Sequence, residues 1–197
     1  MIEERIATQY VPLWIGGSIR GRVRRDLLAV LQRQRELEPG PIGLQLREGS
    51  GAGAQRSRTL QSLARALHSS GLIADWRDEK SAVLDETGTE IARCERGAFR
   101  TLGIQNRAVH VNGYLADGRV WVARRSARKR SDPGMLDNLA AGGVAAGESL
   151  RRCAIRELWE EAGIRGALAR SVDLPLHLSA AGPALLPDRF PSHQDDG

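Results

Sequence analysis

Residues 142–164 read GGVAAGESLRRCAIRELWEEAGI, and the interpretation of the whole chain depends on this stretch. Its second half predicts a helix from about Ser149 to Ala162, because Ser149 suits a helix N-cap and Gly163 suits the left-handed residue that follows a last turn. At 3.6 residues per turn, three glutamates of this helix fall within an arc of about 100°. They are Glu157, Glu160 and Glu161. The sequence therefore predicts three carboxylates along one edge of a helix.

Three neighbouring carboxylates repel one another and require positive charge nearby. Like charges three or four residues apart destabilise a helix by roughly 0.2–0.5 kcal/mol per pair, and by more when they are partly buried. Arg156 can offset only part of this repulsion. A hard divalent cation such as Mg²⁺ prefers carboxylate oxygens and often shares its ligand shell with substrate phosphates. The alternative is a solvent-exposed acidic face on a helix laced with salt bridges.

The stretch matches, position by position, the pattern G-x5-E-x7-R-E-U-x-E-E-x-G-U of the Nudix box, in which U is a bulky aliphatic residue. The matching residues are Gly142, Glu148, Arg156, Glu157, Leu158, Glu160, Glu161, Gly163 and Ile164. At average residue usage, a chance match has odds of about one in ten million. The chain thus resembles the Nudix hydrolases, which cleave a diphosphate linked to another moiety.

This resemblance implies a role for each position of the box. The implied metal ligands are Glu157, Glu160, Glu161 and the carbonyl group of Gly142. The implied ion is Mg²⁺, with Mn²⁺ as a substitute. The implied catalytic residues are Glu157, Glu160 and Arg156, the last by orienting a glutamate through an ion pair. One glutamate, or a residue elsewhere, would activate water. Glu148 would be a further ligand or a structural partner, and Gly163 a structural residue.

The resemblance extends upstream over residues 110–143, HVNGYLADGRVWVARRSARKRSDPGMLDNLAAGG. This run is similar to a subfamily related to the Nudix domain of fungal thiamine pyrophosphokinase proteins. Members carry an extra N-terminal domain, which GLIADWRDE and ARCERGAFRTLGI also resemble. The implied reaction is hydrolysis of thiamine diphosphate, or of its oxidised analogues, to the monophosphate. Oxidised purine nucleoside diphosphates, such as 8-oxo-dGDP, are the alternative substrates.

Side chains upstream of the box are candidates for substrate binding. Arg125 and Lys129 could donate charge-assisted hydrogen bonds to a terminal phosphate, and simple solvation is an equal alternative for each. Asn112, on an expected strand, could face the pocket. His110 could do so as well, although a partly buried histidine with a satisfied hydrogen bond is the favoured interpretation. Cys153 is expected to be a buried small hydrophobic residue.

The expected fold class is α+β, with two domains. Residues 104–197 are expected to form a Nudix fold, a mixed sheet sandwiched by helices and containing the loop–helix–loop box. Residues 1–103 are expected to form a small α+β domain of unassigned function. Only 33 residues follow Ile164, so we expect the C-terminal part of the Nudix fold to be truncated.

Hydrophobic periodicity predicts the local elements. Strands are expected at residues 10–16 and 43–48, and hairpins are expected around 83–92 and 108–125. Helices are expected at residues 19–38 and around 60–67, and a loop is expected at 49–57. Clustered arginines at residues 20–25 are interpreted as a solvated face.

Composition limits the class of protein. The chain has 197 residues, a formal net charge of +5, 41% hydrophobic residues and 4% aromatic residues, which is typical of a globular protein with an aliphatic core. No apolar run reaches the roughly 18 residues that span a bilayer. With two cysteines, a reducing cytoplasm is the expected compartment. The expected partner is a small-molecule diphosphate. Neither a membrane nor a nucleic acid is expected, and a homodimer is left open.

Three alternative functions are open. One, from another class, is a non-catalytic Nudix module that binds phosphorylated ligands, or an inactive fragment. The run RRSARKRSDPGMLDN also resembles isopentenyl-diphosphate isomerases, although those enzymes depart from the standard box and use a separate cysteine. RNA decapping is compatible with the positive charge, but no RNA-binding motif supports it.

Overall fold

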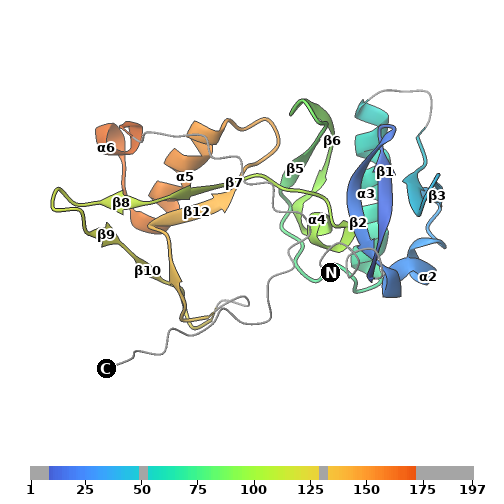
Figure 1. The fold of residues 1–197 in the computed structure, drawn as a ribbon, viewed down its shortest axis with the longest axis horizontal. Helices are drawn as coiled ribbons and strands as arrows, with labels where there is room; N and C mark the ends of the chain where they lie inside the picture. The colour runs from blue at the N-terminus through green and yellow to red at the C-terminus, as the bar shows by residue number, and fades with distance from the viewer. Residues whose placement is uncertain (1–8, 49–52, 129–132, 172–197) are drawn as a thin grey trace.

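The structure is a computed structural model that describes residues 9–48, 53–128 and 133–171 (Figure 1). Its helices and strands pack around two separate hydrophobic cores. The elements around the first core are β1 (Tyr10–Ile15), β2 (Ser18–Arg24), the 3-10 turn η1 (Arg25–Leu27), α2 (Leu28–Leu31), β3 (Leu37–Pro39), β4 (Leu44–Leu46), α3 (Gly53–Ser69), β5 (Lys80–Leu84), β6 (Glu90–Glu95) and α4 (Arg96–Leu102). The remaining elements are β7 (Ala108–Val111), β8 (Gly113–Tyr114), β9 (Val120–Trp121), β10 (Ala123–Arg124), β11 (Leu136–Asp137), β12 (Ala140–Gly143), α5 (Leu150–Ala162) and α6 (Gly166–Arg170).

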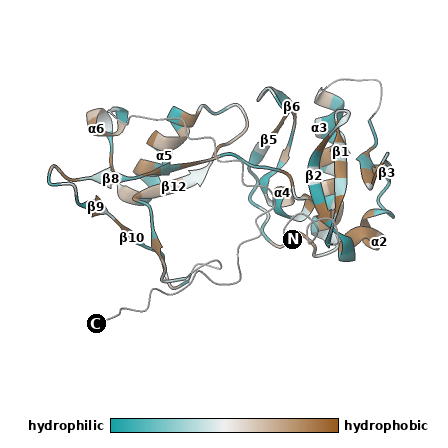
Figure 2. Cartoon of the chain, viewed as in Figure 1, coloured by the Kyte–Doolittle hydropathy of each residue, from teal (hydrophilic) through white to brown (hydrophobic). Residues whose placement is uncertain are grey.

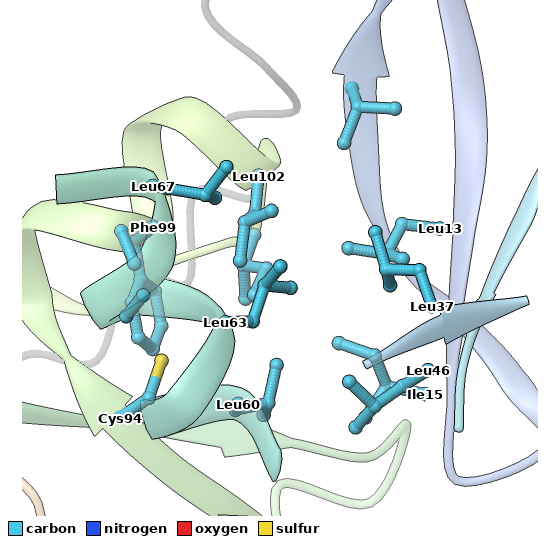
Figure 3. Close-up of a cluster of buried hydrophobic side chains, with 14 of the residues drawn as sticks. Leu13, Ile15, Leu37, Leu46, Leu60, Leu63, Leu67, Cys94, Phe99 and Leu102 are labelled. Atoms are coloured by element: carbon cyan, nitrogen blue, oxygen red, sulfur yellow. The ribbon is translucent and has the colours of Figure 1, made fainter. Parts of the chain in front are cut away.

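The first core forms between a mixed sheet and helix α3. The strand order is β2-β1-β4-β3, with β1 antiparallel to β2 and parallel to β4. Alternate residues of β1 are buried, as expected for a strand with one face on a core. Leu60, Leu63 and Leu67 of α3 point toward the side chains of this sheet (Figure 3). The hairpin of β5 and β6 and helix α4 complete this core.

The second core forms where α5 packs on the antiparallel pair of β7 and β12. Val109 and Val111 of β7 contribute side chains, and α5 contributes Cys153, Ala154 and Leu158. Two short antiparallel pairs, β8 with β9 and β10 with β11, extend from this pair of strands. Large apolar side chains on these short strands are exposed, among them Tyr114, Trp121 and Leu136.

Several predicted elements are confirmed. The strands β1 and β4, the hairpin of β5 and β6, the apolar face of α3 and the helix α5 lie where the sequence places them. The hairpin predicted at 108–125 is confirmed only at its tip, where β8 pairs with β9. Its two ends pair instead with β12 and β11, so the hairpin opens into two separate ladders.

The helix predicted at residues 19–38 is wrong over most of its length, because this stretch begins with strand β2 and is helical only in η1 and α2, over residues 25–31. Hydrophilic arginines and hydrophobic residues share β2 (Figure 2). Gly21 and Val23 are buried while Arg22 and Arg24 are exposed, which is the two-residue period of a strand paired with β1. The loop predicted at 49–57 is also wrong in its second half, where α3 begins at Gly53.

The described residues are a mixed α/β structure. The boundary between residues 103 and 104 stays a prediction, although Ile104 belongs to the first core and Val109 to the second. The expected truncation concerns residues 172–197, which lie outside the described residues. Within the described part of the chain, no helix combines the length and the apolar character needed to cross a membrane.

Two glycines provide a matched test of the packing between β2 and α4. Gly103 and Gly71 follow helices α4 and α3 with left-handed φ angles of 60° and 77°. A Cβ atom on Gly103 would lie 1.9 Å from the carbonyl oxygen of Arg22, whereas one on Gly71 would meet nothing within 4 Å. We expect Gly71→Ala to cost only the left-handed conformation, about 1–2 kcal/mol. Gly103→Ala must also displace β2, and should lower the free energy of unfolding by about 1–3 kcal/mol more.

Urea titration of the two variants and the wild type measures these costs. Equal losses of stability in Gly71→Ala and Gly103→Ala would contradict the close contact between Gly103 and β2.

Candidate functional site

Local sequence fixes both ends of helix α5. The Ser149 side chain accepts a hydrogen bond from the Arg152 backbone N–H at 3.2 Å, as an N-cap residue does. At the other end Gly163 takes a left-handed conformation with a φ of 67°, and the Ile164 N–H donates to the carbonyl of Leu158. The helix therefore holds its side chains in a defined register against β12.

Glu157 is the buried carboxylate of α5, with 6% of its surface exposed. It lies against the backbone of Gly142, where a Cβ atom would be 1.8 Å from Glu157 Oε1. Any side chain at position 142 would displace this carboxylate. Gly142 therefore lets Glu157 approach strand β12 from the helix.

Arg156 joins three of the glutamates. Its Nε and Nη2 atoms donate to the two carboxylate oxygens of Glu148 at 3.0 and 2.9 Å. Its Nη1 atom donates to Glu157 at 2.6 Å and to Glu160 at 3.2 Å. Nη2 also donates to the carbonyl of Gly143 at 3.1 Å. One guanidinium thus ties the loop before α5 to the acidic edge of the helix.

The pairing of Arg156 with Glu148 shifts the protonation of both groups. The hydrogen bond from Arg156 holds the pKa of Glu148 below its ordinary value, although burial opposes this shift. The same hydrogen bond, with a further one to Glu157, raises the pKa of Arg156. Glu148 is therefore ionised and Arg156 charged across the neutral range of pH.

Glu161 lies apart from the Arg156 cluster. Its side chain is exposed and accepts a hydrogen bond from the Ala141 backbone N–H at 3.0 Å. Among the residues that the structure describes, no three His, Cys, Asp or Glu side chains converge as a metal site. The donor types nevertheless fit a hard divalent cation, because Glu157, Glu160 and Glu161 offer carboxylate oxygens. Glu160 and Glu161 are exposed, so their side chains can turn without disturbing the core.

The upstream candidates form a second polar cluster at the C-terminal ends of β7, β10 and β11. The guanidinium of Arg125 pairs with Asp137 at 2.5 Å, and this hydrogen bond lowers the pKa of Asp137. Asn112 is exposed, and its side-chain oxygen accepts a hydrogen bond from Asn138 at 2.6 Å. Lys129 lies outside the described residues.

His110 belongs to the same cluster, with its Nδ1 atom 2.9 Å from the side-chain oxygen of Asn138. Its predicted hydrogen bond is confirmed, but its predicted burial is wrong, because the side chain is exposed. His110 lies on the face of β7 opposite to the buried Val109 and Val111. It pairs in register with Ala141, whose N–H donates to Glu161, so Ala141 lies between His110 and Glu161.

Sequence reasoning missed two members of this cluster, Asp137 and Asn138. Asp137 pairs with Arg125, and Asn138 connects His110 to Asn112. The available signal was the polar pair between Leu136 and Leu139, immediately before the box. The burial of Cys153 is confirmed, and burial raises the pKa of its thiol to about 12.

Comparisons with known proteins point to one family. Residues 105–193 match the family model described as NUDIX domain. Over 118 residues the chain is 36% identical to "Nudix hydrolase 20, chloroplastic" of Arabidopsis thaliana, covering 58% of this chain and 32% of that protein. "Nudix hydrolase 24, chloroplastic" of the same plant is 35% identical over 119 residues, covering 58% of this chain and 33% of that protein.

The match to a bacterial relative covers a larger share of that relative's length. "Uncharacterized Nudix hydrolase orf19" of Rhodococcus erythropolis is 39% identical over 103 residues, which is 52% of this chain and 54% of that protein. The matched part of this chain spans about a third of each of the two plant relatives. The family match includes the box helix α5 and the strands on which it packs. Residues 105–193 are therefore similar to the Nudix domain family, in the part of the chain that contains the box.

Proposed function

We propose that this protein hydrolyses the phosphoanhydride bond of a small-molecule diphosphate with a divalent metal ion. The observation that carries the proposal is the acidic edge of α5, where Arg156 donates to both Glu157 and Glu160 and where Glu157 lies against Gly142. Similarity to proteins named Nudix hydrolases supports the reaction class. A solvated acidic helix explains the arrangement less well, because Glu157 is buried.

The ion would be Mg²⁺, with Mn²⁺ as a substitute. Its ligands would be Glu157, Glu160, Glu161 and the carbonyl oxygen of Gly142. Such an ion neutralises charge on the phosphate oxygens and lowers the pKa of an attacking water. Its oxygen ligands are supplied here by one helix and the strand before it, so a single packing contact sets their spacing.

The chain's own residues would divide the work in the following way. Arg156, clamped by Glu148, would hold the Glu157 carboxylate in place against β12. Glu160 is half exposed and held by a single longer hydrogen bond from Arg156, so it can turn toward substrate. Either Glu157 or Glu160 would accept the proton of the attacking water.

The second polar cluster would bind the phosphates of the substrate. Arg125, oriented by Asp137, would donate to the terminal phosphate, and Lys129 would add a second positive charge. Asn112, held by Asn138, would donate its amide N–H groups to a substrate oxygen. The isomerase alternative is disfavoured, because Cys94 is fully buried and burial raises the pKa of its thiol to about 12.

The cysteine content of the sequence supports the proposed location, whereas the sequence leaves the assembly open. A cytoplasmic location stays a prediction. Two plant relatives are named as chloroplastic, which concerns those proteins and not this chain. A homodimer also stays a prediction, which sedimentation velocity would check.

The substrate prediction is thiamine diphosphate or its oxidised analogues, hydrolysed to the monophosphate. A panel of these compounds and 8-oxo-dGDP, assayed with and without Mg²⁺ and with products identified by mass, would test it. We expect metal-dependent release of a monophosphate from the thiamine compounds at a higher kcat/KM than from 8-oxo-dGDP. The reverse order would favour the purine alternative. Thermal stabilisation by these ligands without any product would favour the non-catalytic module.

Replacing one carboxylate tests the metal site. Glu160→Gln removes a negative charge from the exposed part of the acidic edge and leaves the buried Glu157 in place. Because a metal-stabilised transition state is worth several kcal/mol, we expect kcat to fall by about 100-fold or more. Mn²⁺ affinity, measured by electron paramagnetic resonance, should fall together with kcat. Glu90→Gln is the matched control, since Glu90 also pairs with an arginine but lies on β6. Full activity of Glu160→Gln would refute the metal-ligand assignment.

The clamp on Arg156 should make stability depend on pH. The folded-state pKa of Glu148 is lowered from 4.5, so its ionised form stabilises the fold at higher pH. That contribution is fully present above about pH 4.5 and is lost as the pH falls through the lowered value. We expect wild type to be more stable than Glu148→Gln at pH 7, with the difference shrinking below pH 4.5. Urea titrations of both proteins from pH 3 to pH 7 measure it. A difference that is constant over this range would contradict the assignment.

A further inference from the structure

A hollow of about 450 Å³ lies in the first half of the chain, away from the acidic edge of α5. One wall is the turn between α2 and β3, and the other is helix α3. Its volume falls within the range of small-molecule sites, about 300–1,000 Å³. Neither the proposed hydrolysis nor the family match, which begins at residue 105, uses this region.

One stripe of α3 forms a wall of the hollow. Counted from the first of its four residues, the other three lie three, four and seven positions further along the chain, so all four share one face of the helix. They are Ser62, Arg65, Ala66 and Ser69. Three of these side chains are small, and they leave the space open. The adjoining face, with Leu63 and Leu67, is buried in the first core, so the wall is anchored to the fold.

The opposite wall is a turn whose backbone is held in place. Gln34 donates from its side chain to the Val30 carbonyl at 3.1 Å, and Arg47 donates from Nε to the Arg35 carbonyl at 3.1 Å. The Arg47 N–H donates to the carbonyl of Glu36 at 2.8 Å. These bonds fix the backbone from which Arg33 and Arg35 extend. Less conformational entropy is therefore lost when the two side chains bind a ligand.

Glu36 carries the negative charge of the hollow, and its own partners already satisfy it. It is 6% exposed and accepts hydrogen bonds from the Ser62 hydroxyl at 2.6 Å and from Arg35 Nε at 3.1 Å. Burial acts to raise the pKa of Glu36, but its hydrogen bonds and the charge of Arg35 together outweigh burial and lower the pKa. Glu36 therefore positions Arg35 beside Ser62 and joins the two walls.

The charges of the hollow are unbalanced. Three guanidinium groups and one carboxylate line it, a net charge of +2. Within residues 9–48, 53–128 and 133–171, neither Arg33 nor Arg65 forms an ion pair or a side-chain hydrogen bond. Arginines without a carboxylate partner that line one hollow are suited to a dianion, because the planar fork of a guanidinium matches phosphate oxygens.

We propose that this hollow, between the turn at residues 33–36 and the stripe Ser62–Ser69 of α3, binds the phosphate group of a phosphorylated small molecule. Arg33 and Arg65 would contact the phosphate oxygens from the two walls, and Arg35 would add Nη donors while Glu36 holds its Nε. The limited volume of about 450 Å³ favours a small ligand over a nucleic acid strand, which needs an extended groove.

Inorganic phosphate and pyrophosphate are the probes, titrated calorimetrically into the full chain at low ionic strength with EDTA. EDTA keeps divalent metal from loading the acidic edge of α5. We expect saturable binding that weakens about tenfold or more in Arg33→Ala and in Arg65→Ala, since a lost charge-assisted hydrogen bond costs about 1.5–3 kcal/mol. Arg58→Ala is the matched control, because Arg58 lies on α3 outside the hollow and bonds Gln55. We expect it to leave the affinity within twofold of wild type.

Ala66→Leu tests the cavity without changing charge. Its larger side chain should fill the space between the walls and abolish phosphate binding, while circular dichroism reports that the chain remains folded. Four outcomes would overturn the proposal. The first is that wild type shows no saturable phosphate binding, and the second is that Arg58→Ala and Arg65→Ala lose phosphate affinity equally. The third is that Arg125→Ala abolishes phosphate binding. The fourth is that the chain binds an oligonucleotide through Arg33 and Arg65 but does not bind phosphate.

Discussion

The ion-pair cluster around Arg156 is the interaction on which the candidate site depends. Glu157 is buried between α5 and β12, and a buried carboxylate without a positive partner is strongly unfavourable. Arg156 supplies that partner, and Glu148 fixes the other side of its guanidinium. The absence of a side chain at Gly142 provides the space. Replacing Arg156, Glu148 or Gly142 would displace Glu157, and the carboxylates of α5 would no longer be held in a fixed position against β12.

The parts of the fold that could be predicted from the sequence are those determined by neighbouring residues. Helix α5 has a capping serine, a left-handed glycine and an apolar stripe within one short stretch, so each local signal agrees. Helix α3 has the same consistency over Leu60, Leu63 and Leu67. The spacing of the box glutamates also follows from helix geometry alone, which is why their common edge could be predicted.

The parts that could not be predicted depend on pairing between distant residues. The spacing of Ile19, Val23 and Leu27 suits a helix, but pairing with β1 makes residues 18–24 a strand. Tertiary pairing overrides local propensity in such cases. The same reason hid Asp137 and Asn138, because their partners Arg125 and His110 reach them through the ladders of β10 with β11 and β7 with β12. No local pattern encodes those ladders.

Net charge alone does not show which arginines are available to bind an anion, because some of them are paired with carboxylates. The arginines at residues 20–25 are interpreted from the sequence as a solvated face, yet Arg20 is largely buried and pairs with Glu86, and Arg24 pairs with Asp26. Arg33 and Arg65 are far apart in the sequence and form no evident cluster, yet the fold places both around one hollow. A carboxylate partner reduces the long-range attraction of a basic residue for an anionic ligand, although the remaining N–H groups of the guanidinium can still donate hydrogen bonds. The informative quantity is therefore the pairing of each guanidinium in the fold, rather than the density of arginines along the chain.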